Sequence, residues 1–444
     1  MFRKLVFVAA IAASAAVAQD ATQSPPPLEV DVVGGIDAPM PIAVPALATP
    51  NAVATAAGNT ASLGNQVAAV VASDLRSSGL FTPLGPAGLN SYPYVEATSP
   101  AFPRWRGSGA QALVSGFVEA RPDGRITVGC YLFDVASGRE LARQGYVVGA
   151  AEWRRAAHKC ADAIYTRLSG EGPFFDSRVV YVAETGPKKA RVKRIAIMDA
   201  DGSNHRYLTE GKVTALNPRF SPDGRQLVYT SYLGRIPRVF VIDIASGNER
   251  LLVPGRIMTF APRFSPNGRD IVFSMAQNGN TDLYVVNAYG GPPRRLTATP
   301  GADTSPSYSP DGSRIVFESD RSGTQQLYVM NADGSGQRRI SFGGGRYASP
   351  AWSPRGNRIA FTRIGGTFNI GVMDPSGGNV KILTDGWQDE GPSWAPNGQF
   401  VMFHRTSQGS GQSILYAVSV NGGRARRLPT PQDGSDPSWS PLQN

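Results

Sequence analysis

The chain has 444 residues, a length that favours two domains. A hydrophobic fraction of 41%, with 50 glycines and 35 prolines, is typical of a turn-rich β protein and excludes a disordered chain. The net charge of +10 comes from arginines that are spread along the sequence without a dense patch, so we expect no nucleic-acid partner.

Residues 1–18 have the pattern of a secretory signal peptide. Arg3 and Lys4 form the basic start, Leu5–Val17 is the apolar run, and Ala16-Val17-Ala18 is a small-residue cleavage site. The run is too short to span a bilayer, no other run approaches its length, and no lipid-anchor cysteine lies near the cleavage site. We therefore expect an exported chain without a transmembrane segment.

Residues 19–39 are expected to form a mobile N-terminal segment. Gln19–Pro27 is rich in Pro, Ser and Gln, a composition that favours mobility. Leu28–Val33 alternates between apolar and acidic residues and predicts a strand, which Gly34-Gly35 ends.

Residues 40–170 predict a mixed α/β domain. Val67, Val70, Val71 and Leu75 have helical spacing, which predicts a helix over about 65–77, ended by Gly79. Further predicted elements are strands at Leu113–Glu119, Ile126–Asp134 and Glu140–Val148, an apolar stretch at Ile42–Leu47, and a second helix from Trp153 to Leu168, ended by Gly170. Cys130 and Cys160 either pair as a disulfide or are two small core residues, and the sequence leaves both possibilities open.

Residues 171–444 predict an all-β propeller, because one short phrase recurs six times. The phrase reads Pro-x-(Phe/Tyr/Trp)-(Ser/Ala)-Pro and continues, in five copies, with a turn that ends in Gly. Its fourth residues are Ser221, Ser265, Ser309, Ser353, Ala395 and Ser440. A spacing of about 40–45 residues is typical of a four-stranded propeller blade.

The two ends of the repeat array predict how the ring closes. Val179–Val182 reads like the strand that follows the turn, but no turn precedes it, and the last copy at Pro437–Pro441 has no strand after it. We therefore expect the C-terminal segment to supply the innermost strand beside Val179–Val182 and to complete a six-bladed ring, with Trp439 next to the strand of Val180. Closure of this kind removes open sheet edges.

The sequence offers little catalytic chemistry. A Gly-x-Ser-x-Gly nucleophile motif is absent, and the three histidines, His158, His205 and His404, have no metal-ligand spacing with one another. We therefore expect no enzyme and no catalytic, cofactor-binding or metal-binding residues. The alternative from another class is a periplasmic propeller hydrolase or lyase.

The loops before the innermost strands predict a binding surface at one mouth of the channel. Met258, Phe260 and Tyr347 offer apolar contact area, and four carboxylates, of Asp303, Asp389, Glu390 and Asp436, offer an acidic rim. An apolar centre with polar surroundings is typical of a protein–protein site. The same residues also read as ordinary turn residues, and the acidic rim leaves open a Ca²⁺ ion in the channel.

These features together resemble the TolB family, the periplasmic components of the bacterial Tol–Pal system. The resemblance covers nearly the whole mature chain, and its most specific part is the segment Leu28–Pro45, followed by Val70, Ala72, Asp74, Leu75, Ser78, Gly79 and Phe81. It implies a non-enzymatic hub in the periplasm of a Gram-negative bacterium, which supports outer-membrane integrity and envelope constriction during cell division.

The resemblance also implies two partners and two sets of contact residues. The propeller mouth would bind the lipoprotein Pal through Met258, Thr259, Ala261, Thr304, Ser305, Tyr347, Asp389 and Glu390. The N-terminal strand would bind the inner-membrane protein TolA through Glu29, Val30, Asp31, Val32, Val33, Gly34, Gly35, Ile36 and Asp37. We expect a monomer that reaches both membranes only through these partners.

Overall fold

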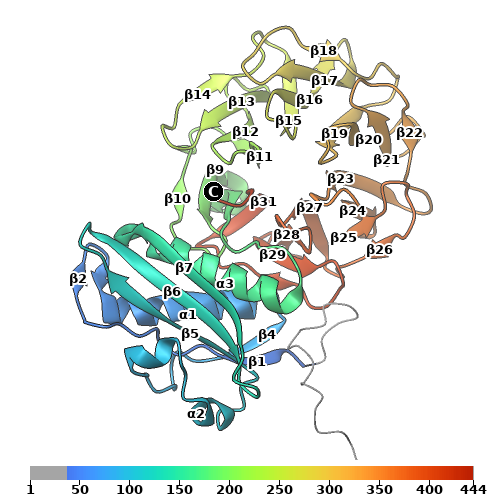
Figure 1. The fold of residues 1–444 in the computed structure, drawn as a ribbon. Helices are drawn as coiled ribbons and strands as arrows, with labels where there is room; N and C mark the ends of the chain where they lie inside the picture. The colour runs from blue at the N-terminus through green and yellow to red at the C-terminus, as the bar shows by residue number, and fades with distance from the viewer. Residues whose placement is uncertain (1–37, 444) are drawn as a thin grey trace, which may run out of the picture.

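The computed structural model describes residues 38–443, which form an α/β domain and a ring of β-sheets (Figure 1). The predicted signal peptide, the predicted strand Leu28–Val33 and the TolA-binding residues Glu29–Asp37 lie outside the described residues. Between residues 38 and 443, no helix is long and apolar enough to cross a membrane.

The α/β domain is built on one five-stranded sheet in the order β4-β1-β5-β6-β7. These strands are β1 (Met40–Ala43), β4 (Phe81–Leu84), β5 (Ala112–Ala120), β6 (Arg125–Asp134) and β7 (Glu140–Gly149). β1 pairs parallel to β4 and β5, whereas β5, β6 and β7 pair antiparallel through tight turns. Short elements complete the domain: β2 (Ala54–Thr55), β3 (Gly58–Asn59) and the 3₁₀ turns Tyr94–Ala97 and Ala150–Glu152.

Two long helices cover one face of this sheet, and a short helix lies on the other (Figure 1). The helices are α1 (Thr60–Ser78), α2 (Phe102–Arg106) and α3 (Trp153–Ser169). α1 starts five residues before the predicted bound because Asn59 caps it, accepting a hydrogen bond from the Ala61 N–H. It ends at Gly79, whose left-handed backbone gives the predicted stop.

Cys130 on β6 and Cys160 on α3 form a disulfide, with their Cα atoms 6.0 Å apart. The bond therefore ties the helical layer to the sheet. Both residues are also buried in the domain core, so each reading of the sequence describes part of their role.

The propeller has six four-stranded blades around a central channel (Figure 1). The first blade contains β8 (Arg178–Thr185), β9 (Val192–Asp199), β10 (Arg206–Tyr207) and β31 (Asp433–Trp439), with a 3₁₀ turn at Lys188–Ala190. The second blade contains β11 (Ala215–Phe220), β12 (Gln226–Ser231), β13 (Arg238–Asp243) and β14 (Glu249–Leu251). The third contains β15 (Met258–Phe264), β16 (Asp270–Gln277), β17 (Asn280–Asn287) and β18 (Arg294–Arg295).

The remaining three blades follow in chain order around the ring. The fourth contains β19 (Asp303–Tyr308), β20 (Arg314–Ser319), β21 (Gln326–Asn331) and β22 (Arg338–Arg339). The fifth blade contains β23 (Arg346–Trp352), β24 (Ile359–Gly365), β25 (Thr367–Met373) and β26 (Lys381–Ile382). The sixth contains β27 (Gln388–Trp394), β28 (Phe400–Thr406), β29 (Ser413–Ser419) and β30 (Arg426–Arg427).

The C-terminal strand closes the ring as the sequence predicted. β31 pairs antiparallel with β8, with Trp439 opposite Val179 and Ser438 opposite Val180. The prediction of six blades with C-terminal strand closure is therefore confirmed. The closure covers the edge of β8 that would otherwise be unpaired.

Aromatic packing joins the propeller to the α/β domain. Phe174 in the linker contacts Phe400 on β28 and Trp439 on β31, with ring centroids 4.9 and 6.1 Å apart. The carboxylate of Asp162 on α3 accepts three backbone N–H bonds, from Phe174, Phe175 and Asp176, at 2.7 to 3.0 Å. The linker is thus held by the core of one domain and by the closing strand of the other.

Replacement of Trp439 by alanine tests this arrangement. The indole donates a hydrogen bond to the Ser177 hydroxyl (2.8 Å) and packs on Phe174, so its loss should lower the free energy of unfolding by about 3 kcal/mol. Urea unfolding measures the change, and Trp387→Ala is the matched control, because Trp387 is 48% exposed and should cost under about 0.5 kcal/mol. An equal loss in the two variants would contradict a special role for Trp439.

Candidate binding face of the propeller

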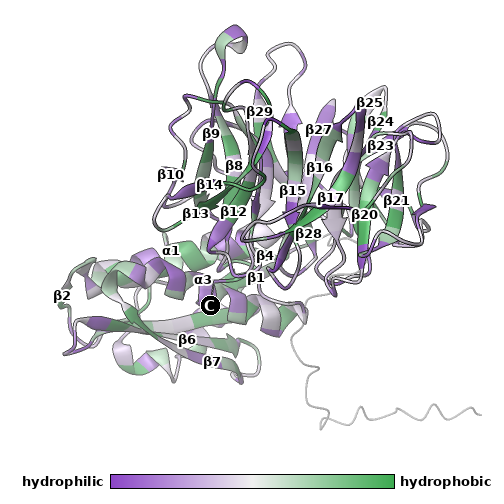
Figure 2. Ribbon diagram, turned by 90° about the horizontal axis from the view of Figure 1, so that it is seen from above, coloured by the Kyte–Doolittle hydropathy of each residue, from purple (hydrophilic) through white to green (hydrophobic). Residues whose placement is uncertain are grey.

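The mouth predicted from the sequence lies on the propeller face that points away from the α/β domain (Figure 2). The α/β domain contacts the turns at the opposite ends of the innermost strands. There the Asn397 side chain donates to the Gly172 carbonyl at 3.0 Å, and Arg355 pairs with Glu171. We call the free side, which carries the start of each innermost strand, the mouth face.

A bulge with a left-handed residue occurs in each of the six innermost strands. In every blade the strand pairing shifts in register just before the proline of the repeated phrase. The residue before that proline has a positive φ between 49° and 67° in all six blades: Asn217, Ala261, Ser305, Ser349, Gly391 and Asp436. Five of these six residues are not glycine, although a positive φ is uncommon for other residues. The bulge is therefore a regular feature of all six innermost strands.

The bulge decides which side chains reach solvent at the mouth face. Side chains alternate along a strand, and the extra residue turns the start of the strand relative to its end. In every blade the residue two positions before the left-handed one is buried: Ala215, Thr259, Asp303, Tyr347, Asp389 and Gly434. The residue three positions before it is partly or fully exposed: Thr214, Met258, Ala302, Arg346, Gln388 and Asp433.

This alternation corrects three of the predicted Pal contacts. Thr259, Tyr347 and Asp389 are 1%, 4% and 0% exposed, so their side chains are not available to a partner at the mouth face. The Thr259 hydroxyl accepts the Val239 N–H at 2.9 Å, and the Tyr347 hydroxyl donates to the Phe342 carbonyl at 3.1 Å. The expectation that these side chains face solvent was wrong, whereas a contact between Pal and these positions stays a prediction.

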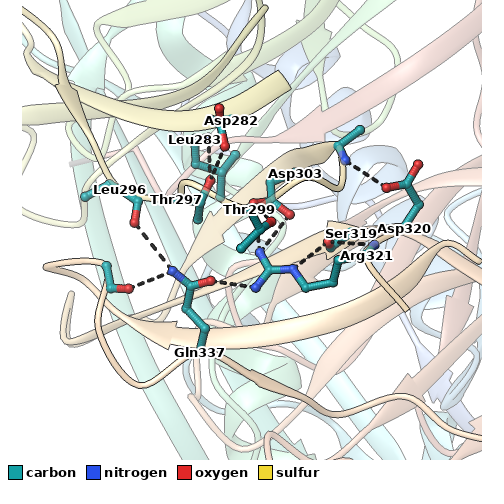
Figure 3. Close-up of polar contacts among 12 residues, drawn as sticks. Asp282, Leu283, Leu296, Thr297, Thr299, Asp303, Ser319, Asp320, Arg321 and Gln337 are labelled. Atoms are coloured by element: carbon teal, nitrogen blue, oxygen red, sulfur yellow. Dashed lines mark hydrogen bonds and ion pairs between the residues drawn. The ribbon is translucent and has the colours of Figure 1, made fainter. Parts of the chain in front are cut away.

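Two of the four carboxylates that were predicted to form the acidic rim are buried. Asp303 is fully buried and forms two hydrogen bonds of 2.8 Å with the guanidinium of Arg321 (Figure 3). Arg321 is held in turn by the Ser319 hydroxyl and by the Gln337 amide oxygen, as Figure 3 shows. Asp389 makes the same two-bond contact with Arg405, at 2.7 and 2.8 Å. These carboxylates hold the first and second strands of their own blade together rather than face solvent.

The other predicted contacts remain at the mouth face. Met258 is 44% exposed, and Ala261, Thr304, Ser305 and Glu390 are partly exposed. The Thr304 hydroxyl donates to Glu318 at 2.8 Å, which orients its methyl group. Sequence reasoning missed the exposed residues Tyr232 and Leu233, which follow β12 at this face. Two consecutive large apolar residues after a predicted strand were the available signal.

Two guanidinium groups line the part of the channel next to the Ser-Pro turns, at the end away from the acidic rim. A cavity of about 400 Å³ is lined by side chains from all six innermost strands, including Arg219 and Arg263. Burial lowers the pKa of Arg219 to about 10 and that of Arg263 well below its usual range, where repulsion by Arg219 adds to the effect. Arg219 Nη1 donates to the Pro218 carbonyl at 2.7 Å. Carbonyl oxygens are the ligands that Ca²⁺ would need, so these residues do not fit a Ca²⁺ site.

The three histidines lie in different parts of the structure and have different neighbours. His404 on β28 lies at the mouth face, with Nε2 4.0 Å from Glu390, and its Nδ1 accepts the Asp436 N–H at 3.4 Å. His205 lies in the turn before β10 and packs edge-on against Tyr207. His158 is buried on α3 beside Asp74. No two of them form a catalytic pair among the contacts of residues 38–443.

The fold and the mouth face define a six-bladed propeller with an N-terminal α/β domain and a face suited to protein binding. Family models match the TolB amino-terminal domain over residues 28–141 and the TolB β-propeller domain over residues 165–443. The chain belongs to the TolB family, and its relatives are components of the Tol–Pal system of Gram-negative bacteria.

Relatives and one solved structure are similar over most of the chain. The Tol-Pal system protein TolB of Rhizorhabdus wittichii is 70% identical over 415 residues, which cover 94% of each chain. The TolB of Zymomonas mobilis is 66% identical over 94% of this chain and 91% of its own. The crystal structure of TolB from Acinetobacter baumannii matches with a TM-score of 0.79 and 28% identity, over 91% of this chain and 97% of that one.

The bulge at Ala261 can be tested by a single substitution to glycine. Ala261 has a φ of 50°, a conformation that costs an L-residue about 1 kcal/mol, so Ala261→Gly should leave the free energy of unfolding unchanged or raise it by up to about 1 kcal/mol. The control Ala348→Gly removes a buried methyl from β23 at a residue paired with Thr362, directly before the left-handed Ser349, and should lower it by about 1 kcal/mol. Equal losses in chemical denaturation would show that the bulge carries no strain.

Proposed function

We propose that this protein links the lipoprotein Pal to the inner-membrane protein TolA in the periplasm. In this proposal the mouth face binds Pal and residues 29–37 bind TolA. The chain acts by binding rather than by catalysis, without an ion in the channel, and supports outer-membrane integrity and envelope constriction during cell division. Support comes from the Tol–Pal names of its relatives and from the signal-peptide pattern of residues 1–18.

The observation that carries the Pal proposal is a set of large apolar side chains exposed around the mouth face. They adjoin the starts of innermost strands or the ends of second strands: Tyr232, Leu233, Met258, Phe342 and Trp387, with exposed fractions of 40% to 63%. Exposed apolar residues gathered on one face are typical of a protein-binding site.

Polar and charged residues lie between these apolar side chains. Arg346 is exposed, and Glu390 is partly exposed next to Gln388, whose amide donates to its carboxylate at 2.7 Å. A partner would therefore meet apolar anchors within a polar rim, which is the usual composition of a specific interface. Met258 lies on β15, so a partner would meet this anchor without a cost of ordering it.

Substitution of Met258 by glutamate tests the Pal proposal. Met258 is 44% exposed and belongs to none of the buried contacts between blades, so a charge there should weaken Pal binding at least tenfold, about 1.4 kcal/mol, without unfolding the chain. Isothermal titration with the soluble domain of Pal measures the affinity.

The matched control is Tyr289→Glu. Tyr289 is 86% exposed but lies in the turn between β17 and β18, at the ends of the blades away from the mouth face. Unchanged Pal affinity in both variants, or an equal loss in both, would exclude the mouth face as the Pal site.

Removal of residues 19–37 tests the TolA proposal, because it deletes the predicted strand and the residues after it. TolA binding should be abolished in a pull-down or titration with the periplasmic part of TolA. A shorter deletion of residues 19–27 is the control: it removes the Pro- and Gln-rich stretch, keeps Glu29–Asp37, and should retain TolA binding. Retention of TolA binding in the longer deletion would refute the assignment.

We also propose that the two partners are coupled through the position of the N-terminal segment. A ligand shifts a conformational equilibrium only through different affinities for the two states. The Pal affinity of the 19–37 deletion should therefore differ from that of the intact chain, and identical affinities would remove the coupling part of the proposal.

A further inference from the structure

A group of buried and partly buried charged side chains lies between the two domains, on the side of the ring away from the mouth face. It contains Asp74 on α1, His158 on α3, and Asp199 and Asp201 at the end of β9 and in the turn after it. The helices belong to the α/β domain and the turn belongs to the first blade. We call these four residues the interdomain cluster.

His158 is held in a single orientation by a carboxylate. The imidazole is 2% exposed, and its Nδ1 lies 2.6 Å from Oδ2 of Asp74, which is 4% exposed. Histidines that bind metals almost always give their other ring N–H to a carboxylate or a carbonyl, which fixes the tautomer and the direction of the lone pair. With the proton on Nδ1, the lone pair of Nε2 points away from Asp74.

Nε2 of His158 lacks a hydrogen-bond partner among the described residues, although it is buried. Its nearest carboxylate oxygen is Oδ2 of Asp201, at 3.7 Å, which is too long for a hydrogen bond. Nε2 and one oxygen each from Asp199 and Asp201 lie within 4.8 Å of one another. Metal–ligand bonds of about 2.0–2.2 Å place neighbouring tetrahedral ligands about 3.3 Å apart, so small side-chain movements would bring these atoms around one ion.

The charge of the cluster favours a cation. Three carboxylates lie near two guanidinium groups, that of Arg154, whose Nη1 donates to Oδ2 of Asp201 at 2.6 Å, and that of Arg178, whose charge interacts with Asp199. With a neutral imidazole the excess is one negative charge. Each carboxylate oxygen has two lone pairs, so the bond from Arg154 leaves Asp201 able to bind an ion.

The rival occupant of Nε2 is a proton. A protonated imidazole would leave Nε2–H without an acceptor within hydrogen-bond distance. A divalent ion would use all three ligand atoms.

We propose that His158, Asp199 and Asp201 form a divalent-metal site that bridges the two domains, with Asp74 as the residue that orients His158. One imidazole and two carboxylates are a donor set that suits Zn²⁺, whereas Ca²⁺ and Mg²⁺ prefer oxygen ligands alone. The sequence predicted no metal-binding residues, because the ligands lie far apart in the chain and come from two domains. A bound ion would join α3 directly to the first blade and stabilise the arrangement of the domains.

The test uses the full mature chain, purified without a polyhistidine tag and treated with a chelator. Titration calorimetry with Zn²⁺ should show one site per chain, and saturating Zn²⁺ should raise the melting temperature by several degrees. Mg²⁺ at the same concentration should do neither. Zn²⁺ affinity should fall at least tenfold in Asp199→Asn and in Asp74→Asn.

Asp243→Asn is the matched control, because Asp243 occupies the same place at the end of β13, one repeat later, and also receives hydrogen bonds from its own turn. Its Zn²⁺ affinity should equal that of the unmodified chain. A measurement on the unmodified chain covers the case in which an Asp199 or Asp74 variant does not fold: Zn²⁺ should shift the ¹⁵N resonance of Nε2 in His158.

Three results would overturn the proposal. They are an absence of Zn²⁺ binding at one equivalent per chain, equal affinities in Asp199→Asn and Asp243→Asn, and an unchanged His158 resonance at saturating Zn²⁺. In each of these cases His158 is an imidazolium that pairs with the carboxylates as a charge contact between the domains.

Discussion

The pairing of β31 with β8 is the interaction on which the rest of the structure depends. It joins the two ends of the propeller, so the six mouth-face strands have fixed positions only while it holds. The same strand carries Trp439, which packs on Phe174 of the linker and donates to Ser177. One strand therefore closes the ring and also holds the α/β domain against it, so ring closure and domain docking are parts of a single event.

The ring of bulges is the second constraint, and it sets the chemistry of the mouth face. A left-handed residue before each proline turns the strand start, so that Met258 faces solvent while its neighbour Thr259 bonds to the next blade. The buried arginine–aspartate contacts at Asp303 and Asp389 then join neighbouring strands within this frame. Of the exposed apolar side chains, that of Met258 is carried by strand β15, whereas Tyr232, Leu233, Phe342 and Trp387 lie in loops next to strand ends.

The sequence was sufficient to predict the fold because the repeat is local. Spacing alone gave six blades, and the incomplete first and last copies gave the closure at Val179 and Trp439. The site was harder to predict, because exposure at the mouth depends on the bulge, which appears in the sequence only as a small or polar residue before proline. Pairings such as Arg321 with Asp303, or His158 with Asp201, depend on tertiary positions that no local pattern contains.

The mouth face and the face toward the α/β domain differ in their contacts. This difference limits how binding at one face can affect binding at the other. The mouth face is built on strands whose hydrogen bonds and buried aromatic residues resist deformation. The opposite side meets the α/β domain through the interdomain cluster around His158, the pairing of Arg355 with Glu171, and the packing of Phe174 on Phe400 and Trp439. A change in the α/β domain can alter these contacts without bending the blades. Coupling between partners at the two ends of the molecule would thus act by movement of the domains relative to each other, with the ring as a rigid body.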